Sequence, residues 1–199
     1  MPDFSYETDA KSRGSNIVCG VDEAGRGPLA GPVCAAAVIL PENCVIDGLN
    51  DSKKLSEKKR EALFPVIKQK AIAYSIAFAG VEEIEKFNIL NATYLAMNRA
   101  VEGLEIKPDI AFIDGNRVPV NAPVFCETII KGDLKSYSVA AASVLAKVSR
   151  DRLMLEYDKK YPEYGFAAHK GYGTKAHYEA IEKFGICEIH RRSFLKNVL

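Results

Sequence analysis

Short apolar runs along the chain predict five β-strands. Each run is rich in β-branched or small apolar residues and is bounded by Gly, Pro, Asn or Asp. The predicted strands cover residues 17–21, 33–40, 71–79, 110–113 and 124–130. The Gly- and Pro-rich segment 25–32 joins the first two strands and is too short for a parallel crossover. We therefore expect these two strands to form an antiparallel hairpin.

Longer stretches whose apolar residues recur near every 3.6 positions predict helices. They cover residues 56–70, 81–104, 138–161 and 175–184, and Ser56 is the expected N-cap of the first. Three strands followed by alternating helix and strand indicate a mixed five-stranded α/β sheet flanked by helices. We divide the chain into a loose, flexible N-terminal segment 1–16, an α/β domain 17–160 and a C-terminal helical extension 161–199 packed on that domain.

Composition supports a globular protein and excludes some classes. The 199 residues are 48% hydrophobic, enough for a core, and no apolar run approaches the length of a membrane span. The five cysteines are scattered without a C-x-x-C pair, so neither a disulfide framework nor a zinc site is indicated. The polar N-terminus lacks a signal-peptide pattern. We expect a cytoplasmic protein with reduced thiols and no contact with membranes.

The charge is unevenly distributed along the chain. The formal net charge is only +1, which argues against a protein that coats polyanions. Lys and Arg are nevertheless in excess within residues 51–70 and 168–199, whereas residues 81–114 are acidic. Solvated helix faces explain most such stretches, but a local polyanion-binding face remains compatible with them.

Acidic residues follow three of the predicted strands. Asp22 and Glu23 end the first strand, Asp114 ends the fourth, and Asp133 follows the fifth. Each acid alone would ordinarily be a solvated loop residue. Strand ends in α/β sheets form the crevice where ligands bind, and carboxylates gathered there repel one another unless a cation neutralises them. Oxygen ligands without a Cys/His cluster favour Mg²⁺ or Mn²⁺.

The adjacency of Asp22 and Glu23 is a difficulty for that site. Successive side chains on a regular strand point to opposite faces, so both cannot converge from an ideal pleat. Either the strand ends or twists at Glu23, or Glu23 offers its backbone carbonyl. We expect Asp22 and Asp114 to bind metal directly. Glu23 is the next candidate ligand, and Asp133 is expected to be an outer or second-metal ligand.

An ordered set of motifs then indicates a family. GVDEAGRGPLAGPV, NDSKKLSEKKR, FIDGNR, KGD, SVAAASVLAKVSRD, HKGYGT and HRRSF occur in this order. The chain resembles bacterial ribonuclease HII, the type 2 ribonuclease H, from about Ile17 to Phe194. The resemblance implies a ribonuclease H-like fold, and a metal-dependent endonuclease that cleaves the RNA strand of RNA–DNA hybrids. It also implies cleavage on the 5′ side of single ribonucleotides in duplex DNA, leaving 5′-phosphate and 3′-hydroxyl ends.

The same resemblance assigns the catalytic and metal-binding roles to Asp22, Glu23, Asp114 and Asp133. Four carboxylates suffice for two divalent ions, which can activate water and stabilise the leaving oxygen. We therefore expect Mg²⁺ or Mn²⁺ as cofactor and no organic cofactor. The expected partners are RNA–DNA hybrids and ribonucleotide-containing DNA duplexes, bound by a monomer.

The Gly25-Arg26-Gly27 turn and Tyr172 are expected to contact the nucleic acid. The turn could serve only to close a hairpin, and its glycine spacing fits a dinucleotide fingerprint poorly. The resemblance implies instead that its backbone contacts the ribonucleotide 2′-OH, the group that distinguishes RNA from DNA. Tyr172 is either a buried loop tyrosine or, by resemblance, a residue that senses the RNA–DNA junction.

The remaining expected contacts are basic or polar. Ser52, Lys53 and Lys54 precede the first basic helix, so they either cap its start or bind phosphate. Arg191 and Arg192 could equally pack the tail or bind phosphate. We also assign Lys170 to the nucleic-acid surface.

Two other functions are compatible with these residues. One is a related nuclease or resolvase that uses the same carboxylates on another nucleic-acid structure. The other is a catalytically silent hybrid-binding module, against which the complete acidic set argues.

Overall fold

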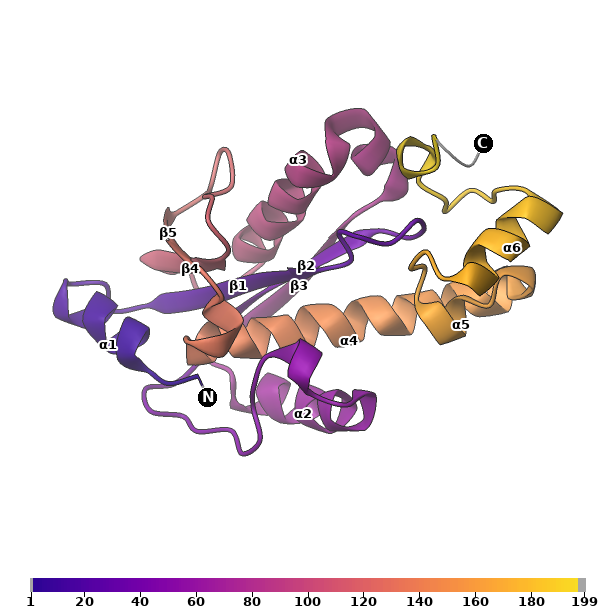
Figure 1. The fold of residues 1–199 in the computed structure, drawn as a ribbon. Coiled ribbons are helices and arrows are strands. Elements are labelled where there is room, and N and C mark those ends of the chain that lie inside the picture. Colours follow the sequence, from indigo (N-terminus) through magenta and orange to yellow (C-terminus); the bar gives the residue numbers. More distant parts are fainter. Residues whose placement is uncertain (1, 197–199) are drawn as a thin grey trace.

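A five-stranded mixed sheet forms the centre of the protein, as expected from the apolar pattern. The computed structural model describes residues 2–196. The strands are β1 (Val18–Ala24), β2 (Val33–Ile39), β3 (Ala73–Ala79), β4 (Ile110–Asp114) and β5 (Phe125–Ile129), in the order β3-β2-β1-β4-β5 (Figure 1). The pairs β1–β2 and β2–β3 are antiparallel, whereas β1–β4 and β4–β5 are parallel. The predicted hairpin and the mixed α/β class are confirmed.

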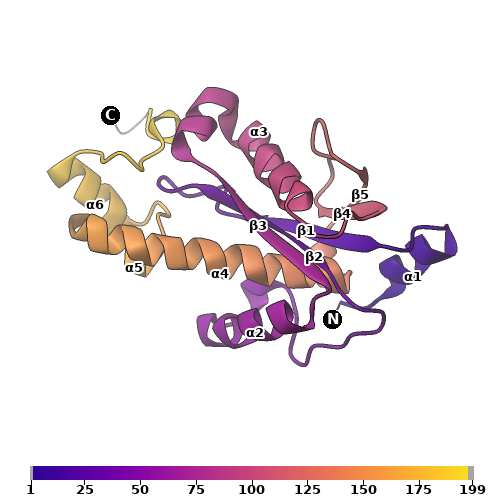
Figure 2. The same cartoon turned by 180° about the vertical axis from the view of Figure 1, so that it is seen from behind.

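Helices cover both faces of this sheet. The long helix α4 (Tyr137–Lys160) and α2 (Glu57–Lys70) lie on one face, and α3 (Val81–Glu102) lies on the other (Figures 1 and 2). The shorter helices are α1 (Ser5–Ser12), α5 (Phe166–His169) and α6 (Lys175–Phe184). Four 3₁₀ turns complete the described chain: η1 (Ser52–Lys54), η2 (Gly132–Leu134), η3 (Pro162–Tyr164) and η4 (Arg192–Phe194).

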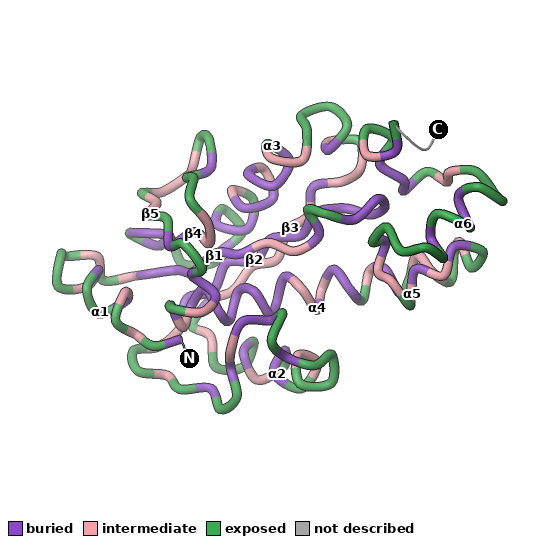
Figure 3. Tube along the Cα trace, in the orientation of Figure 1, coloured by how far each residue is buried: buried purple, intermediate pink, exposed green. Residues whose placement is uncertain are grey.

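The alternation of side chains along the strands produces two apolar layers. Cys19, Val21 and Ala35 pack on the α3 side, whereas Ala36 and Val38 pack on the side of α2 and α4. Strands β1, β2 and β4 and the first half of α4 are mostly buried, whereas β3 is largely half-buried and β5 is partly exposed (Figure 3). Strands β1 and β4 contribute to the layer on the α3 side, and on the other face Val18, Ile110 and Phe112 pack with Val139 of α4 in a further buried cluster.

Helix α4 lies against the bare backbone of β1 at Gly20. A Cβ atom at Gly20 would lie 2.2 Å from the backbone nitrogen of Val139 and 2.2 Å from the carbonyl carbon of Ser138. Glycine is therefore required by packing and not by an unusual backbone angle. Gly20 is two residues before Asp22 in β1, so this contact fixes the start of α4 close to Asp22.

The N-terminal segment corrects the expectation of a loose start. Helix α1 lies within it, and the buried Glu7 carboxylate accepts hydrogen bonds from Ser136 Oγ (2.6 Å), Ser138 N (3.0 Å) and Ser138 Oγ (2.8 Å). Polar bonds attach α1 to the start of α4. Apolar contacts contribute as well, because Phe4 stacks on Tyr137, and Tyr6 and Ala10 pack in the buried cluster of Phe112. The hydrophobic pattern did not indicate this helix because these apolar residues are too sparse for a helical stripe.

Helix α3 also differs from the single continuous helix that was expected. Asn88 has a left-handed φ of 67°, which breaks the helical path. Its Oδ1 accepts hydrogen bonds from the backbone of Leu90 and Asn91, at 3.0 and 3.1 Å. This is the bonding of an N-cap, so Asn88 starts a second helical segment inside the predicted range.

The C-terminal helices pack on the loop between β1 and β2 and on the end of α4. Leu29 and Met154 from those elements join Phe166, Ile181 and Leu195 in one buried cluster. This arrangement places the C-terminal segment next to the Gly25-Arg26-Gly27 turn. None of the helices within residues 2–196 is long and apolar enough to cross a membrane.

The Gly20 contact gives a prediction for stability. Gly20→Ala should lower the free energy of unfolding by about 3 kcal/mol, at the upper end of the usual range for overpacking, because the new methyl group meets backbone atoms that cannot rotate away. Urea denaturation measures the change. Gly80→Ala is the matched control, since a Cβ there has no atom within 4 Å of it. Equal stability of the two variants would contradict the packing argument.

Candidate active site

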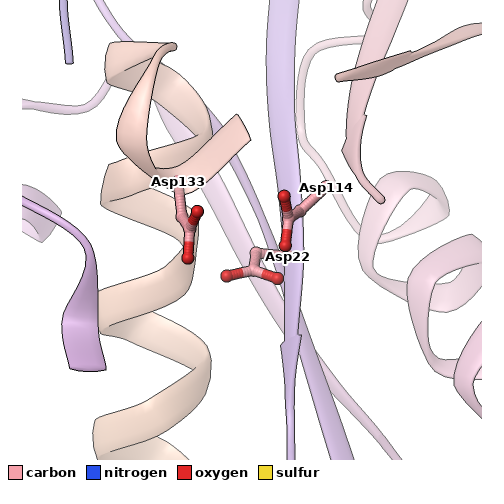
Figure 4. A group of neighbouring side chains, drawn as sticks. All are labelled: Asp22, Asp114 and Asp133. Carbon is pink, nitrogen blue, oxygen red and sulfur yellow. The ribbon is translucent and has the colours of Figure 1, made fainter. Parts of the chain in front are cut away.

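Three aspartates meet at the carboxyl ends of β1 and β4. The parallel register pairs Val21 with Ile113, so Asp22 and Asp114 are the next residues along neighbouring strands. Asp133 comes from η2, directly before α4. One carboxylate oxygen from each aspartate lies within 4.8 Å of the others, and the three side chains point toward one another (Figure 4). The sequence prediction that strand ends gather these acids agrees with this geometry.

Backbone groups orient two of these side chains. Asp114 Oδ1 accepts a hydrogen bond of 2.7 Å from the backbone nitrogen of Gly132, which connects the end of β4 to η2. Asp22 Oδ1 accepts one of 2.7 Å from the backbone nitrogen of Glu23. Lys131, with a φ of 58°, turns the chain so that η2 follows β5 at this point. The carboxylates are thus held by the backbone before any ligand binds.

The electrostatics of the cluster are unfavourable without a cation. Burial raises the pKa of Asp22 well above its ordinary value, and the charges of Glu23 and Asp114 raise it further. Burial and the charge of Asp114 also raise the pKa of Asp133. Lys53 is close, with Nζ 3.4 Å from Asp133 Oδ2, but its side chain is 76% exposed. Buried, convergent oxygen ligands fit Mg²⁺ or Mn²⁺.

Glu23 is not part of the group of three aspartates, although its charge acts on Asp22. Strand β1 continues through Ala24, so the strand does not end at Glu23. The Glu23 side chain lines a separate cavity of about 300 Å³ together with Asp114 and Tyr94. Burial raises its pKa, while Arg26, with Nη1 3.3 Å from Glu23 Oε1, lowers it. The alternation rule therefore holds at Asp22 and Glu23, and the two acids approach Asp114 from different sides.

The Gly25-Arg26-Gly27 turn follows β1 directly. Gly25 has a φ of 97°, which favours glycine, and a Cβ there would lie 2.0 Å from Arg150 Nε. The carbonyls of Gly25 and Arg26 accept hydrogen bonds from Arg191 Nη2 and Nη1, at 2.6 and 2.9 Å.

The position of Arg191 corrects its assignment to the nucleic-acid surface. Its side chain is fully buried and bound to the turn. Of the two roles considered, the structure therefore supports packing, because a guanidinium that is buried against carbonyls does not face a phosphate.

Tyr172 lies beside the same turn although it is 145 residues away from Gly27 in sequence. A Cβ at Gly27 would lie 3.6 Å from the tyrosine ring, and Leu29 N donates a 2.8 Å hydrogen bond to Gly171 O. The Tyr172 side chain is 43% exposed, which excludes the alternative of a buried loop tyrosine. The exposed ring therefore lies against the turn, which begins two residues after Glu23.

The other expected contacts divide into exposed and inward-facing side chains. Lys53, Lys54 and Arg192 are exposed and available to phosphates. Ser52 is buried, and its backbone nitrogen donates to Ser143 Oγ at 3.3 Å. Lys170 Nζ donates to Ala167 O at 2.5 Å and its side chain is only 13% exposed. Ser52 and Lys170 therefore help to shape their loops in this structure and are not open to solvent like Lys53.

Sequence reasoning missed Arg150, which the structure places next to the turn. Its fully buried guanidinium donates hydrogen bonds to the carbonyls of Ala30, Pro32 and Lys170, each at 3.0 Å. The signal in the sequence is an arginine that directly follows the Ala- and Ser-rich stretch 138–149 of the predicted helix.

Comparison with known proteins identifies the family. The sequence model of the family described as Ribonuclease HII matches residues 19–197. The chain belongs to this family. It is 55% identical over 194 residues to the ribonuclease HII of Clostridioides difficile, covering 98% of this chain and 76% of that protein. It is 56% identical over 196 residues to the enzyme of Caldicellulosiruptor bescii, covering 98% and 95% of the two chains.

Solved structures of related proteins share the fold. The ribonuclease H2 of Pyrococcus horikoshii matches with a TM-score of 0.75 at 28% identity, over 92% of this chain and 96% of the other. The ribonuclease HII of Archaeoglobus fulgidus, solved in a complex with PCNA, matches with a TM-score of 0.71 at 25% identity, over 91% and 96%. Ribonuclease HII membership and the ribonuclease H-like fold are confirmed. The chain is accordingly a ribonuclease H endonuclease that acts on RNA–DNA hybrids.

The raised carboxyl pKa values give a prediction for the metal-free protein. A carboxyl whose pKa is higher in the folded state stabilises that state below its unfolded pKa, and this contribution is lost as the pH rises through the folded pKa. Asp22→Asn should therefore raise the free energy of unfolding at pH 8 without metal by about 1–3 kcal/mol, and by less near pH 4.5.

Urea denaturation at the two pH values tests this, with the exposed Asp47→Asn as control. Added Mg²⁺ or Mn²⁺ should stabilise the unsubstituted protein more than the Asp22→Asn variant. A wild-type protein that is no less stable than Asp22→Asn at pH 8 would contradict the repulsion inferred from the geometry.

Proposed function

We propose that this ribonuclease HII family member is a divalent-metal-dependent endonuclease. It cleaves the RNA strand of hybrids and the 5′ side of single ribonucleotides embedded in duplex DNA, leaving 5′-phosphate and 3′-hydroxyl ends. The observation that supports this most strongly is the group of Asp22, Asp114 and Asp133, closely followed in the chain by a glycine turn that lies against an exposed aromatic residue. A protein that only binds nucleic acid gains nothing from buried carboxylates next to a polyanion.

The carboxylates are the proposed metal ligands. Asp22, Asp114 and Asp133 form one oxygen-lined group, and Glu23 shares a second cavity with Asp114. Asp114 therefore borders both positions and is the residue best placed to serve two ions. Divalent ions bound there would activate the attacking water and stabilise the leaving oxygen. The protein contributes fixed ligand positions, since Gly132 N and Glu23 N already orient two of the carboxylates.

The turn and Tyr172 are proposed to select the ribonucleotide. The backbone of Gly25, Arg26 and Gly27 would bond the 2′-OH, and the Tyr172 ring would stack on the neighbouring sugar. A DNA substrate leaves such buried polar groups without a partner, and sites of this kind reject the analogue by about 10⁴–10⁵-fold. Lys53, Lys54 and Arg192 are proposed to contact phosphates, which position the duplex without reading its sequence.

The proposed partners are thus RNA–DNA hybrids and DNA duplexes that contain ribonucleotides, bound by a monomer in the cytoplasm without an organic cofactor. A related nuclease acting on other nucleic-acid structures, and a silent binding module, are the alternatives. Rates on a DNA duplex with one ribonucleotide, on an all-DNA duplex and on a branched duplex distinguish all three when measured with and without divalent metal.

Substitution of the central aspartates should abolish cleavage. Asp22→Asn or Asp114→Asn removes a negative metal ligand but no phosphate contact, so the rate should fall by about 10³-fold or more, by analogy with the loss of other key electrostatic groups. Hybrid binding measured by fluorescence anisotropy should stay within about threefold, a change worth less than 1 kcal/mol.

Asp133→Asn should be severe as well, but partly rescued by additional metal if Asp133 acts from outside the first ligand sphere. Asp47→Asn, an exposed acid far along the chain from the cluster, serves as control. Wild-type turnover by Asp22→Asn would exclude the carboxylate mechanism.

Tyr172→Ala should reduce cleavage at a single ribonucleotide much more than it reduces duplex binding. Loss of base or sugar stacking on an aromatic ring is worth about 1–3 kcal/mol, or roughly 5–150-fold in rate if it acts on the transition state. Tyr172→Phe separates the stacking from the hydroxyl group. Side-by-side rates and affinities for the two variants provide the test, and a wild-type rate for Tyr172→Ala would limit this tyrosine to packing.

A further inference from the structure

Two fully buried arginines lie behind the Gly25-Arg26-Gly27 turn. Arg150 projects from α4, and Arg191 precedes η4 in the C-terminal segment. Within residues 2–196, neither guanidinium has a carboxylate oxygen within 4.0 Å. Both guanidinium groups donate their hydrogen bonds to backbone carbonyls. Two buried cations without an anionic partner are unusual, because burying a charge is costly unless it is paired.

The six hydrogen bonds donated by the two guanidinium groups connect the segment 25–32 to the C-terminal segment. Arg191 donates to the carbonyls of Gly25 (2.6 Å), Arg26 (2.9 Å) and Gly31 (2.8 Å). Arg150 donates to the carbonyls of Ala30, Pro32 and Lys170, each at 3.0 Å. The first arginine therefore holds the turn, and the second holds the hairpin loop to the segment that carries Tyr172.

Further contacts close the same unit. Leu29 N donates to Gly171 O, and Arg191 N donates to Leu29 O, both at 2.8 Å. The Cζ atom of Arg150 lies 6.0 Å from the centre of the Tyr172 ring. The absence of a side chain at Gly25 is also required by this arrangement, because a Cβ there would overlap Arg150.

The energetics argue that stability alone does not explain the pair. Replacing buried ionic groups by apolar residues is often neutral or stabilising, so a fold gains little stability from keeping them. Burial lowers the pKa of both groups, which is the expected sign of this unfavourable environment. A planar guanidinium with five donors can, however, bind several carbonyls in fixed directions, which a lysine ammonium cannot. The two arginines therefore serve to fix the positions of the carbonyl groups that they bind.

We propose that Arg150 and Arg191 are positioning residues that set the distance between the Gly25–Gly27 turn and Tyr172, and thereby the preference for an isolated ribonucleotide over a continuous RNA strand. This inference rests on the proposed function, in which the turn binds the 2′-OH and Tyr172 stacks on the next sugar. Both contacts form together only if their separation matches one nucleotide step. At the position beside Tyr172, a deoxyribose next to the ribonucleotide then fits better than a second ribose.

The experiment compares Arg150→Lys and Arg191→Lys with the intact chain. For each protein, kcat/KM is measured on a DNA duplex with one ribonucleotide and on a continuous RNA–DNA hybrid. The ratio of the two values does not depend on the fraction of folded enzyme, so it remains informative even for a destabilised variant. Both substitutions should lower this ratio at least about tenfold, equivalent to about 1.4 kcal/mol.

Arg152→Lys is the matched control. Arg152 lies two residues along α4, its side chain is 48% exposed, and it forms an ion pair with Glu61. Its substitution should leave the ratio within about twofold, since exposed ion pairs contribute little. Thermal unfolding of all three variants separates changes in stability from changes in the ratio.

A second comparison tests whether Arg150 acts through Tyr172. In a Tyr172→Ala background, Arg150→Lys should cause no further change in the ratio, because the contact it positions is already absent. An unchanged ratio in both lysine variants would overturn the proposal, and so would an undiminished effect of Arg150→Lys in the Tyr172→Ala background. If the intact chain cuts neither substrate with divalent metal, the proposed function fails instead.

Discussion

The contact between α4 and the bare backbone of β1 determines the position of every part of this site. At Gly20 the helix lies so close that no side chain fits between the two elements. The helix start brings Asp133 to Asp22 and Asp114, and its middle carries Arg150 to the hairpin loop. Its far end packs with the C-terminal helices. One close helix–strand contact thus connects the carboxylates to the turn and to Tyr172.

The three carboxylates of the cluster repel one another, and the folded chain alone does not neutralise them. Burial and mutual repulsion both oppose ionisation of Asp22, yet backbone donors hold its side chain in place. The nearest cation, on Lys53, stands at the exposed edge of the cluster and cannot neutralise three carboxylates. A nucleic acid adds further negative charge. The structure is therefore consistent with a site that binds divalent cations and substrate together, which is how a metal-dependent nuclease gains its charge balance.

The features that depend on local patterns were predictable from the sequence, and those that depend on tertiary packing were not. The strands and most helices follow from apolar spacing, and the aspartates follow from their places at strand ends. The alternation rule also anticipated that Asp22 and Glu23 face different sides. Helix α1 was missed because its apolar residues are sparse and much of its attachment comes from hydrogen bonds between Glu7 and two serines.

The misassigned arginine shows a different limit of sequence reasoning. A basic residue in a C-terminal HRRSF motif looks like a phosphate ligand, and only the surrounding carbonyls show that Arg191 is buried. Its neighbour Arg192 remains exposed. Burial of an arginine depends on which carbonyls other segments leave unpaired, and that information is distributed over the chain. The kink at Asn88 is similar, because a capping asparagine is compatible with either a helix interior or a new start.

The proposed recognition of the sugar by backbone groups depends on the same geometry. Glycines flank Arg26, whose side chain reaches back to Glu23, so the turn presents mainly peptide groups to a substrate. Peptide groups are flexible in a glycine turn unless something fixes them, and a loose turn could adapt to a deoxyribose as well as to a ribose. Arg191 removes that freedom by holding two successive carbonyls of the turn. In the proposed mode of binding, the turn then discriminates by the position of its peptide groups, and the metal centre need not distinguish RNA from DNA.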